Sequence, residues 1–413
     1  MFMKKIFLFL IVLFSVIATN AQHGADKRYV LMVSFDGFRY DYVERYNAPN
    51  FKKFIANGIA ADAMISTFPS KTFANHYAII TGLHAGHNGL VDNLFYDPAT
   101  QTTYSTSNRL LVENPLYYGG LPLWQLVQQN GMKAASFFWP GSETKIAGSY
   151  PDYWKKYDGR VPNEARIDTV VHWLSLPQKD RPVFVSLYFS LTDEVGHQFG
   201  PFSDETRKAV LECDRLLGLI MAQLEAKHLE VNVVLVSDHG MAEIEPKAEK
   251  LLAEEKLFAG LDRNKMILTS SGTHVRFYCK DPSYKDELYY ALKKRESHFK
   301  VYLREETPER WHCRENDRSG DVLLVMDSGY EVVPQKVKDK ILKDGIAVGA
   351  HGYDPENRDV QGIFYASGPQ IVKGKKIPAF ENVNVYPFVA ELLGIANLPP
   401  VDGEKTLLKP YVK

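Results

Sequence analysis

Acidic and imidazole side chains of this sequence fall at the ends of apolar runs, where a folded sheet would bring them together. They follow three separate runs or lie in one glycine-rich turn: Asp36, Asp193, His197, Asp238, His239 and His351. In open α/β sheets, ligands bind outside the carboxyl ends of the strands, so we expect these side chains at one rim. Aspartates crowded at one edge repel one another strongly unless cations neutralise them. The pattern therefore predicts a metal site.

The ligand types indicate which ions this rim would hold. Carboxylate and imidazole groups without a thiolate suit Zn²⁺ and admit Mn²⁺ or other first-row ions. Asp193 and His197, at i and i+4, share one face of a helical turn. The ligands divide into two sets of three, and catalytic zinc commonly uses three protein ligands with one position open. Two such ions ~3.5–4 Å apart can hold the attacking and leaving oxygens of an in-line displacement.

Thr72 is the candidate nucleophile, because it begins the predicted helix Thr72–Thr81. A helix N-terminus and a metal ion could together stabilise its deprotonated hydroxyl. Each residue also has a plainer interpretation, since threonine commonly caps helices and aspartate after a strand is common in turns. The prediction of chemistry rests on the coincidence of all these residues at strand or helix ends.

The elements that would position these residues alternate along the chain. Three apolar runs fit strands buried on both faces, as in a parallel sheet: Tyr29–Phe35, Pro182–Phe189 and Val231–Val236. Helical stretches separate them: Thr72–Thr81, Leu123–Gly131, Asn163–Leu174 and Ser203–Lys227. Such alternation predicts an α/β fold, with a mostly parallel sheet sandwiched by helices.

The chain of 413 residues is longer than single cores usually grow, so we expect more than one structural unit. Residues 22–261 and 335–413 are assigned to the catalytic α/β domain. Between them, residues 262–334 read as short strands around a predicted helix at Pro282–Glu296, and they are assigned to a small α+β insertion. The role of the insertion is left open.

The first residues have the composition of a cleaved secretory signal peptide, assigned to residues 1–21. A basic head, Lys4 and Lys5, precedes an apolar run from Ile6 to about Ala18, which is shorter than the ~20 residues of a spanning helix. An uncleaved anchor is the alternative. No cysteine follows the run, which disfavours a bacterial lipid anchor. We expect a secreted or periplasmic protein with no stable membrane span after signal cleavage.

The composition excludes several function classes. The net charge is -1 and no Lys/Arg block is long enough for a nucleic-acid arm, so no nucleic-acid polymer is expected as a partner. Cys213, Cys279 and Cys313 lie far apart without a CxxC pair, which argues against a thiolate metal site, although two of them could pair in an oxidising compartment. Neither G-x-S-x-G nor a G-x-G-x-x-G after the first strand is found, which disfavours a serine hydrolase and a dinucleotide-dependent oxidoreductase.

The motifs, in the order Asp36, KTFANHYAIITG, TDEVGH, SDHGM and AHGYD, resemble those of the nucleotide pyrophosphatase/phosphodiesterase family of the alkaline phosphatase superfamily. The resemblance runs from about Tyr29 to Pro369 and implies an alkaline-phosphatase-like fold. It also implies two zinc ions per chain. One would be bound by Asp36, Thr72, Asp238 and His239, and the other by Asp193, His197 and His351.

The resemblance further implies how a substrate is bound. Thr72 would be the nucleophile that becomes phosphorylated, and Asn93 would donate a hydrogen bond to a phosphoryl oxygen. Phe73 and Tyr188 resemble the aromatic pair that sandwiches a nucleobase, and Tyr157 resembles a further tyrosine at the nucleotide pocket. The choline-phosphate branch of the family departs from the KTFxNHY form, so the presence of this form favours nucleotide-like diesters.

The sequence departs from the family pattern at two places. Ala74 replaces a proline that often follows the Phe of KTF, and we expect little consequence. GLHAGHNG differs from the usual GLYPxxHG form, so His84 and His87 are expected to be structural or surface residues. His76 is expected to pack beneath the site. No role is assigned to the histidines of the insertion, which are His274, His298 and His312.

These observations predict a metal-dependent phosphodiesterase or nucleotide pyrophosphatase that acts through a phospho-threonine intermediate and releases nucleoside monophosphates. The expected partner is a small nucleotide-type diester, and the leaving group and oligomeric state are left open. A related phosphomonoesterase or phosphonate hydrolase is the first alternative. A sulfatase is disfavoured because no cysteine has a proline two residues later. A metal-stabilised binding protein is the alternative of another class, disfavoured by the presence of Thr72 with all the other ligands.

Overall fold

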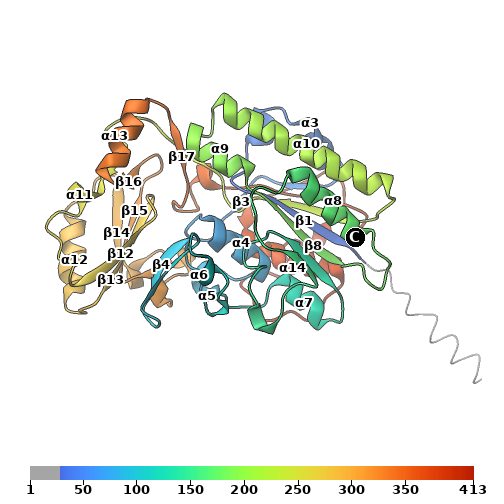
Figure 1. Ribbon diagram of the computed structural model, residues 1–413, viewed down its shortest axis with the longest axis horizontal. Helices are drawn as coiled ribbons and strands as arrows, with labels where there is room; N and C mark the ends of the chain where they lie inside the picture. Colours follow the sequence, from blue (N-terminus) through green and yellow to red (C-terminus); the bar gives the residue numbers. More distant parts are fainter. Residues whose placement is uncertain (1–27) are drawn as a thin grey trace, which may run out of the picture.

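The computed structural model describes residues 28–413, and at its centre lies an eight-stranded sheet (Figure 1). The strand order is β19 (Lys375–Ile377), β2 (Ile59–Ala61), β18 (Phe364–Ser367), β9 (Asn232–Val236), β1 (Val30–Phe35), β8 (Phe184–Phe189), β6 (Ala134–Phe137) and β7 (Tyr153–Lys155). β18 runs antiparallel to both of its neighbours, and the other pairs are parallel. The predicted signal peptide, residues 1–21, lies outside the described residues.

Helices cover both faces of this sheet (Figure 1). One face carries α4 (Thr72–Thr81), α7 (Leu123–Gln129) and α14 (Val385–Leu393). The other face carries α3 (Pro49–Ala56), α8 (Asn163–Leu174) and α10 (Asp204–Ala226). A short helix, α9 (Leu191–Phe199), follows β8 directly.

The central strand β1 contributes to two hydrophobic cores. Val30 and Met32 pack on the face of α4 and α14, whereas Leu31, Val33 and Phe35 pack on the face of α3 and α10. Successive side chains of a strand point to opposite faces, and here both faces are covered. The uninterrupted apolar run that predicts β1 follows from this double burial.

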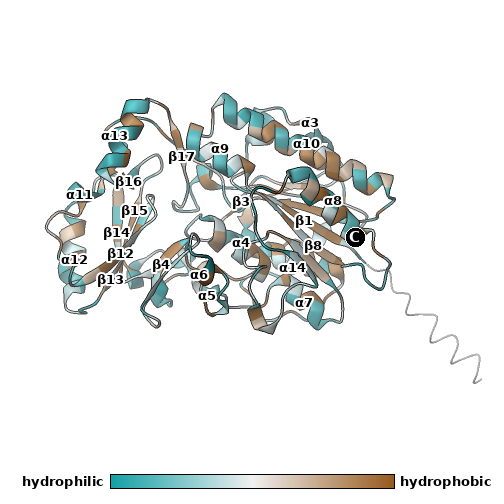
Figure 2. Cartoon of the chain, viewed as in Figure 1, coloured by the Kyte–Doolittle hydropathy of each residue, from teal (hydrophilic) through white to brown (hydrophobic). Residues whose placement is uncertain are grey.

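The outer helices are amphipathic, whereas the central strands are hydrophobic along their length (Figure 2). In α10, Val210, Leu217 and Leu224 are buried at helical spacing, and charged residues face solvent. The helix begins at Asp204 because the Ser203 side chain accepts a hydrogen bond from the Thr206 N–H at 3.1 Å.

A second, antiparallel sheet lies beside the first, at the left of Figure 1. Its order is β12 (Met266–Ser270), β13 (His274–Cys279), β15 (Val322–Met326) and β14 (Phe299–Leu303). The helix α12 (Tyr284–Lys293) packs on it, and β11 (Leu251–Ala253), paired with β16 (Glu331–Val333), joins the same core. We call this part the smaller lobe. The boundary predicted at residue 262 stays a prediction.

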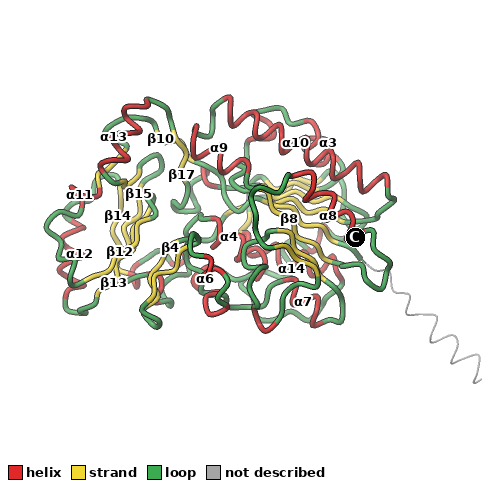
Figure 3. Tube along the Cα trace, in the orientation of Figure 1, coloured by secondary structure: helices red, strands yellow, loops and turns green. Residues whose placement is uncertain are grey.

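Shorter elements complete the fold (Figure 3). The remaining strand pairs are β3 (Met64–Ile65) with β20 (Phe380–Glu381), β4 (Leu94–Asp97) with β5 (Thr102–Ser105), and β10 (Ala242–Ile244) with β17 (Val348–Ala350). The remaining α-helices are α2 (Tyr42–Arg45), α5 (Ala85–Asn88), α6 (Arg109–Val112), α11 (Glu254–Leu257) and α13 (Gln335–Asp344). Within residues 28–413, no helix combines the length and hydropathy of a membrane span. Cys213, Cys279 and Cys313 are unpaired.

Candidate active site

The carboxyl ends of β1, β8 and β9 meet at one rim of the central sheet, as predicted from the apolar runs. Ser34 of β1 lies opposite Val236 of β9, so Asp36 and Asp238 extend from neighbouring strand ends. His351 reaches the same rim by another route, directly after β17, which pairs with β10. Residues far apart in the sequence therefore meet because of strand order and register.

Two overlapping groups of side chains at this rim could each hold a cation. Ligand atoms of Asp36, Asp238 and His239 all lie within 4.8 Å of one another, and so do those of Asp193, His239 and His351. His239 Nε2 lies 2.9 Å from Asp238 Oδ2 and 3.5 Å from Asp36 Oδ1. His239 therefore joins the two groups.

His197 adds to the second of these groups. Its Nε2 lies 3.4 Å from Asp193 Oδ1 and 3.0 Å from His351 Nε2. Asp193 Oδ1 is also 3.4 Å from His351 Nε2. The structure thus brings together all the acids and histidines that the sequence predicts for the rim.

Backbone carbonyl oxygens orient the three imidazole rings. Each Nδ1 lies at hydrogen-bond distance from one of them: His197 from Gly349 O at 2.8 Å, His239 from Gly240 O at 2.8 Å, and His351 from Ser70 O at 2.7 Å. A ring that donates from Nδ1 to a carbonyl oxygen has a free lone pair on Nε2. This is the usual arrangement around metal-ligating histidines, and here it turns each Nε2 towards the rim.

Each rim carboxylate keeps one buried oxygen without a hydrogen-bond donor. Asp36 Oδ1, Asp193 Oδ1 and Asp238 Oδ2 are buried without a hydrogen-bond partner, and the cation-forming groups near them are imidazoles, those of the rim and that of His76. Burial raises the pKa of Asp36 well above its ordinary value, and the charges of Asp238 and Asp193 raise it further. Burial and the charge of Asp193 likewise raise the pKa of Asp238. Buried carboxylates are costly without a cation, so this donor set fits divalent ions.

Thr72 is the first residue of α4 and does not cap it. The N-cap position belongs to Lys71, and no side chain caps this helix. The Thr72 hydroxyl is therefore free of a capping role, and its Oγ1 lies 3.3 Å from His239 Nε2. Because N–H groups at a helix start favour negative charge, this is a suitable place for an alkoxide or a phosphoryl oxygen.

Asn93 lies beside the start of the same helix. Its Oδ1 accepts a hydrogen bond from the Phe73 N–H at 2.9 Å. This bond fixes the amide with its oxygen towards the backbone, which leaves Nδ2 to donate. A donor is thereby oriented next to Thr72.

Asp92, directly before Asn93, is enclosed by side chains of β13. Its Oδ1 accepts from the Asn93 N–H at 2.7 Å, and its Oδ2 accepts from Arg276 Nε at 3.2 Å and forms a short hydrogen bond with His274 Nε2. Burial lowers the pKa of His274, but its Nδ1 also faces an oxygen, that of Gly352 at 3.1 Å, and only the imidazolium can donate to both oxygens. Burial alone would raise the pKa of Asp92, whereas His274 and Arg276 hold it well below its ordinary value.

The predicted aromatic residues differ in exposure. Tyr188 is 7% exposed, and its hydroxyl donates to Asp36 Oδ2 at 2.5 Å. Tyr157 is 40% exposed and its ring centroid lies 6.4 Å from that of Tyr188. Phe73 is partly buried against the core of α4. Tyr157 therefore offers the most accessible ring face of the three, and Tyr188 lies beneath the rim.

His76 lies beneath the rim, as expected. It is fully buried, with Nδ1 at 2.9 Å from Thr72 O and Nε2 at 2.8 Å from Ser34 Oγ. Burial lowers the pKa of His76 to about 3, so the ring is neutral and positions the start of α4.

A cavity of about 580 Å³ lies elsewhere, at the amino end of β9, where Arg28, Asn232 and Gln370 contribute to its lining. Because it lies at the opposite end of the strands from the rim, it takes no part in the candidate active site.

The residues around Asp92 were missed in the sequence. A signal was present: His274 and Arg276 are two positions apart in THVRFYC, so they share one face of a strand that is otherwise apolar. Two cationic groups on a buried strand face indicate a buried acidic partner. The partner itself lies 182 residues away from His274 and has no local signature.

The chain is similar to known proteins over most of its length. The profile of the family described as type I phosphodiesterase / nucleotide pyrophosphatase matches residues 30–354. Venom phosphodiesterase CdcPDE of Crotalus durissus collilineatus is 36% identical over 417 residues, which cover 96% of this chain and 48% of that protein. Ectonucleotide pyrophosphatase/phosphodiesterase family member 1 of Homo sapiens is 32% identical over 391 residues, covering 91% of this chain and 41% of that protein. The chain spans about half the length of the curated relatives it matches.

Solved structures of similar proteins share the fold over most of the chain. Murine ectonucleotide pyrophosphatase/phosphodiesterase 5, as an inactive threonine-to-alanine variant in complex with AMP, superposes with a TM-score of 0.86 at 29% identity. The match covers 94% of this chain and 100% of the murine one. The human counterpart superposes with a TM-score of 0.85 at the same identity and coverage.

Proposed function

Because the chain belongs to the type I phosphodiesterase/nucleotide pyrophosphatase family, we propose that it hydrolyses a phosphodiester or pyrophosphate bond of a nucleotide-type substrate. The products are a nucleoside monophosphate and the leaving alcohol or phosphate compound. One observation carries this proposal: Thr72 Oγ1 lies 3.3 Å from His239 Nε2, in a rim of buried carboxylate oxygens that lack hydrogen-bond partners.

The proposed cofactors are two Zn²⁺ ions. One is held by Asp36, Thr72, Asp238 and His239, and the other by Asp193, His197 and His351. The two groups of convergent ligand atoms and the unpartnered carboxylate oxygens support this assignment. When bound, zinc acts as a Lewis acid that favours a deprotonated hydroxyl and neutralises charge on the phosphoryl group.

Thr72 is the proposed nucleophile of a two-step displacement. In the first step, its Oγ, after losing the hydroxyl proton, forms a bond to phosphorus while the bond to the leaving oxygen breaks. The intermediate is a phosphodiester of Thr72 that still carries the nucleoside. In the second step, a water oxygen attacks its phosphorus, Oγ leaves and regains a proton, and the nucleoside monophosphate is released. The free hydroxyl at the start of α4, with N–H groups of the first turn nearby, supports this role.

Asn93 and the aromatic side chains are the proposed substrate-binding groups. Asn93 Nδ2 donates to a phosphoryl oxygen, because the hydrogen bond from Phe73 N–H to Oδ1 fixes the amide. Phe73 and Tyr157 present ring faces to the base, and each stacking contact contributes ~1–3 kcal/mol without reading base identity. Tyr188 acts through its hydroxyl, which holds Asp36. The AMP held by the murine structural neighbour is in keeping with a nucleotide substrate.

We place this activity outside the cytoplasm. The composition of residues 1–21 and the names of the relatives, venom and ecto-enzymes, support a secreted or periplasmic protein. The expected partner is the small nucleotide substrate alone.

The Thr72→Ala variant tests the proposal. It should lower turnover of bis(p-nitrophenyl) phosphate by at least ~10³-fold, because the nucleophile is lost. Thr169→Ala is a matched control, since that hydroxyl bonds only to its own helix at Ala165 O. Acid quenching of the unmodified protein during turnover should leave one p-nitrophenyl phosphate group, bound through phosphorus, on the peptide that contains Thr72. Full turnover by Thr72→Ala would remove the covalent route.

Substrate preference separates the proposed reaction from its nearest alternative. The unmodified protein should cleave bis(p-nitrophenyl) phosphate faster than p-nitrophenyl phosphate, and should convert ATP into AMP and pyrophosphate. A faster monoester reaction would instead assign a phosphomonoesterase. If neither substrate turns over with zinc supplied, the protein is a binding protein.

A further inference from the structure

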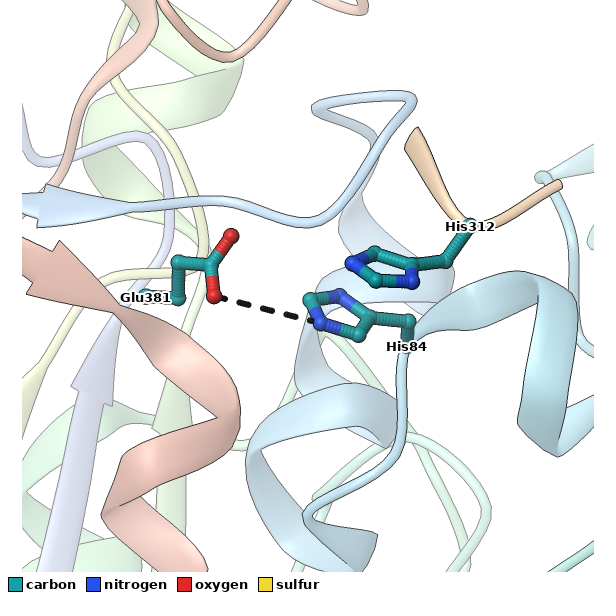
Figure 4. Close-up of side chains that lie close together, drawn as sticks. All are labelled: His84, His312 and Glu381. Atoms are coloured by element: carbon teal, nitrogen blue, oxygen red, sulfur yellow. Dashed lines mark ion pairs between the residues drawn. The ribbon is translucent and has the colours of Figure 1, made fainter. Parts of the chain in front are cut away.

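Two histidines and a glutamate from three distant segments converge away from the rim (Figure 4). His84 is the N-cap of α5, His312 follows the turn Glu309–Trp311 of the smaller lobe, and Glu381 ends β20. One ligand atom from each lies within 4.8 Å of the other two. We propose that this cluster binds a divalent transition-metal ion such as Zn²⁺, at a site that shares no residue with the rim.

His84 is oriented for coordination. Its Nδ1 lies 3.2 Å from Thr67 Oγ1, and its Nε2 faces Glu381 Oε2 at 4.0 Å. A hydroxyl at Nδ1 fixes the ring and leaves Nε2 for an ion, as outer partners of metal ligands do. A gap of 4.0 Å is too long for a hydrogen bond. Ligand atoms of a tetrahedral zinc site lie ~3.4 Å apart, so a small shift of the carboxylate closes the site.

The charges of the cluster favour a cation. His84 is buried, and burial lowers the pKa of His84 to about 3; burial also lowers the pKa of His312. In the part of the chain that the structure describes, no lysine or arginine forms an ion pair with Glu381. Asp402 adds a second carboxylate, which together with burial raises the pKa of Glu381.

The backbone holds His312 against α5. A Cβ at Gly86 would lie 1.8 Å from His312 O, so only glycine permits this approach, and His312 itself has a left-handed φ of 49°. The rings of His84 and His312 stack with centroids 3.9 Å apart and planes 11° apart (Figure 4). Stacked rings cannot both aim a lone pair at one ion. Binding therefore includes a rotation of the partly exposed His312 ring about its Cβ–Cγ bond.

His87 is the candidate for a fourth ligand. Its Nδ1 lies 2.7 Å from Asp402 Oδ2, which also accepts from the His84 N–H at 2.7 Å. A carboxylate at Nδ1 leaves Nε2 free, and the His87 ring centroid lies 5.3 Å from that of His312. The donor set is then imidazole with carboxylate, which suits zinc and neighbouring first-row ions.

An ion at this site would tie the smaller lobe to the body of the protein. His312 belongs to the smaller lobe, whereas His84 and Glu381 belong to elements around the central sheet. A ligand that binds only the folded state raises the thermal midpoint, so zinc should stabilise the protein even where the rim cannot bind it.

Metal content of the full chain tests the proposal. After equilibrium dialysis against a low, buffered concentration of free Zn²⁺, His312→Ala and Glu381→Gln should each hold one ion fewer per chain than the unmodified protein. His298→Ala is the matched control, since His298 is an exposed histidine of the same lobe that stacks on Tyr330. It should keep the full content. All three variants should retain turnover at saturating zinc, because none of these side chains belongs to the rim.

A second measurement separates this site from the rim. In an Asp238→Asn background, which weakens the rim, Co²⁺ should still bind and give the visible absorption of a tetrahedral ion. Adding His312→Ala should abolish that signal and the zinc-dependent rise of Tm, while circular dichroism without metal stays unchanged. Equal metal content in His312→Ala, Glu381→Gln and the unmodified protein, with equal zinc-dependent Tm, would overturn the proposal. So would a tetrahedral Co²⁺ signal that is as strong in the double variant as in Asp238→Asn alone.

Discussion

Buried aspartates lie in two places near the start of α4: Asp92 in one, and Asp36 with Asp238 in the other. The two places differ in how well the protein itself compensates the negative charge. Asp92 has a partner at each oxygen, with Asn93 N–H on one side and Arg276 and His274 on the other. Asp36 and Asp238 each keep one buried oxygen without a hydrogen bond. The pKa of Asp92 is accordingly held below its ordinary value, whereas burial raises the pKa of Asp36 and Asp238 above it.

The difference shows how the source of the counter-charge distinguishes a structural buried aspartate from a metal ligand. Where the protein supplies the counter-charge itself, as Arg276 does for Asp92, the acid is part of the framework. Where aspartates gather and no lysine or arginine of the described residues forms an ion pair with them, as at the rim, the missing charge has to come from a bound cation. We call Asp92 with His274 and Arg276 the closed network, because its charges are paired within the protein. We call the rim aspartates the open network, because their charge is not.

The largest expected effect is on the open network. Dialysis against a chelator should lower turnover of bis(p-nitrophenyl) phosphate by ~10³-fold or more, since bound ions supply several kcal/mol of transition-state stabilisation. Zn²⁺ should restore it, and circular dichroism should stay unchanged throughout. Turnover that survives exhaustive chelation would mean that the rim acids need no cation. The proposed difference between the rim aspartates and Asp92 would then be wrong.

Exchanging one acid from each network gives opposite changes in stability. Asp92→Asn should lower the free energy of unfolding by about 3–5 kcal/mol, because it leaves Arg276 buried without its counter-charge. Asp238→Asn should leave the stability of the chelated protein unchanged or raise it, because an unpaired buried carboxylate is removed.

Urea unfolding in the presence of a chelator measures both variants. The same sign of change for Asp92→Asn and Asp238→Asn would show that the two networks do not differ in kind. Arg276→Gln provides a check from the other side, because it removes one of the two ion-pair partners of Asp92 that the described residues contain and should destabilise as Asp92→Asn does.

Asn93→Ala tests whether the residue next to Asp92 takes part in the proposed reaction. Loss of the amide donor should lower kcat by about 10²–10³-fold with a smaller change in KM, as expected for a donor to a developing negative charge. Stability should change less than in Asp92→Asn, because Asn93 is only partly buried. A change in KM alone would assign Asn93 to ground-state binding.

The smallest expected effect is a pH dependence of the closed network. The pKa of Asp92 is lowered in the folded protein, so its contribution to stability is fully present above the unfolded value of about 3.8 and is lost as pH falls below it. The stability difference between the unmodified protein and Asp92→Asn should therefore be constant above about pH 5 and shrink in more acidic solution. Urea midpoints across acidic pH measure it, and a difference that grows on acidification would contradict the sign.

Much of the fold could be predicted from local patterns. The predicted family and the alkaline-phosphatase-like α/β fold are confirmed by the profile match and by the structural neighbours. The run Tyr29–Phe35 became β1 from Val30 to Phe35, and the predicted helix at residues 163–174 coincides with α8. Period and composition sufficed here, because burial on both faces of a strand and on one face of a helix leaves a local signature.

The contacts between segments could not be predicted in the same way. Sequence reasoning treated Tyr188 only as a member of a base-binding pair, whereas register places it opposite Ser34 and brings its hydroxyl to Asp36. His84 and His312 were expected to be structural or without a role, yet their rings stack across 228 residues of sequence. Such pairs depend on where distant loops meet, for which a single sequence carries no periodic signal.

The position of β1 at the middle of the sheet has a consequence for how the chain reaches its native state. Val30 pairs with Phe184 on one side and with Asn232 on the other. More than 150 residues therefore follow Val30 in the chain before the first of the neighbouring strands is synthesised. Contacts of such long sequence separation slow folding and leave an apolar strand open to association with other chains. Recombinant production should therefore respond more to chaperone supply and slow synthesis than to changes at the surface of the finished protein.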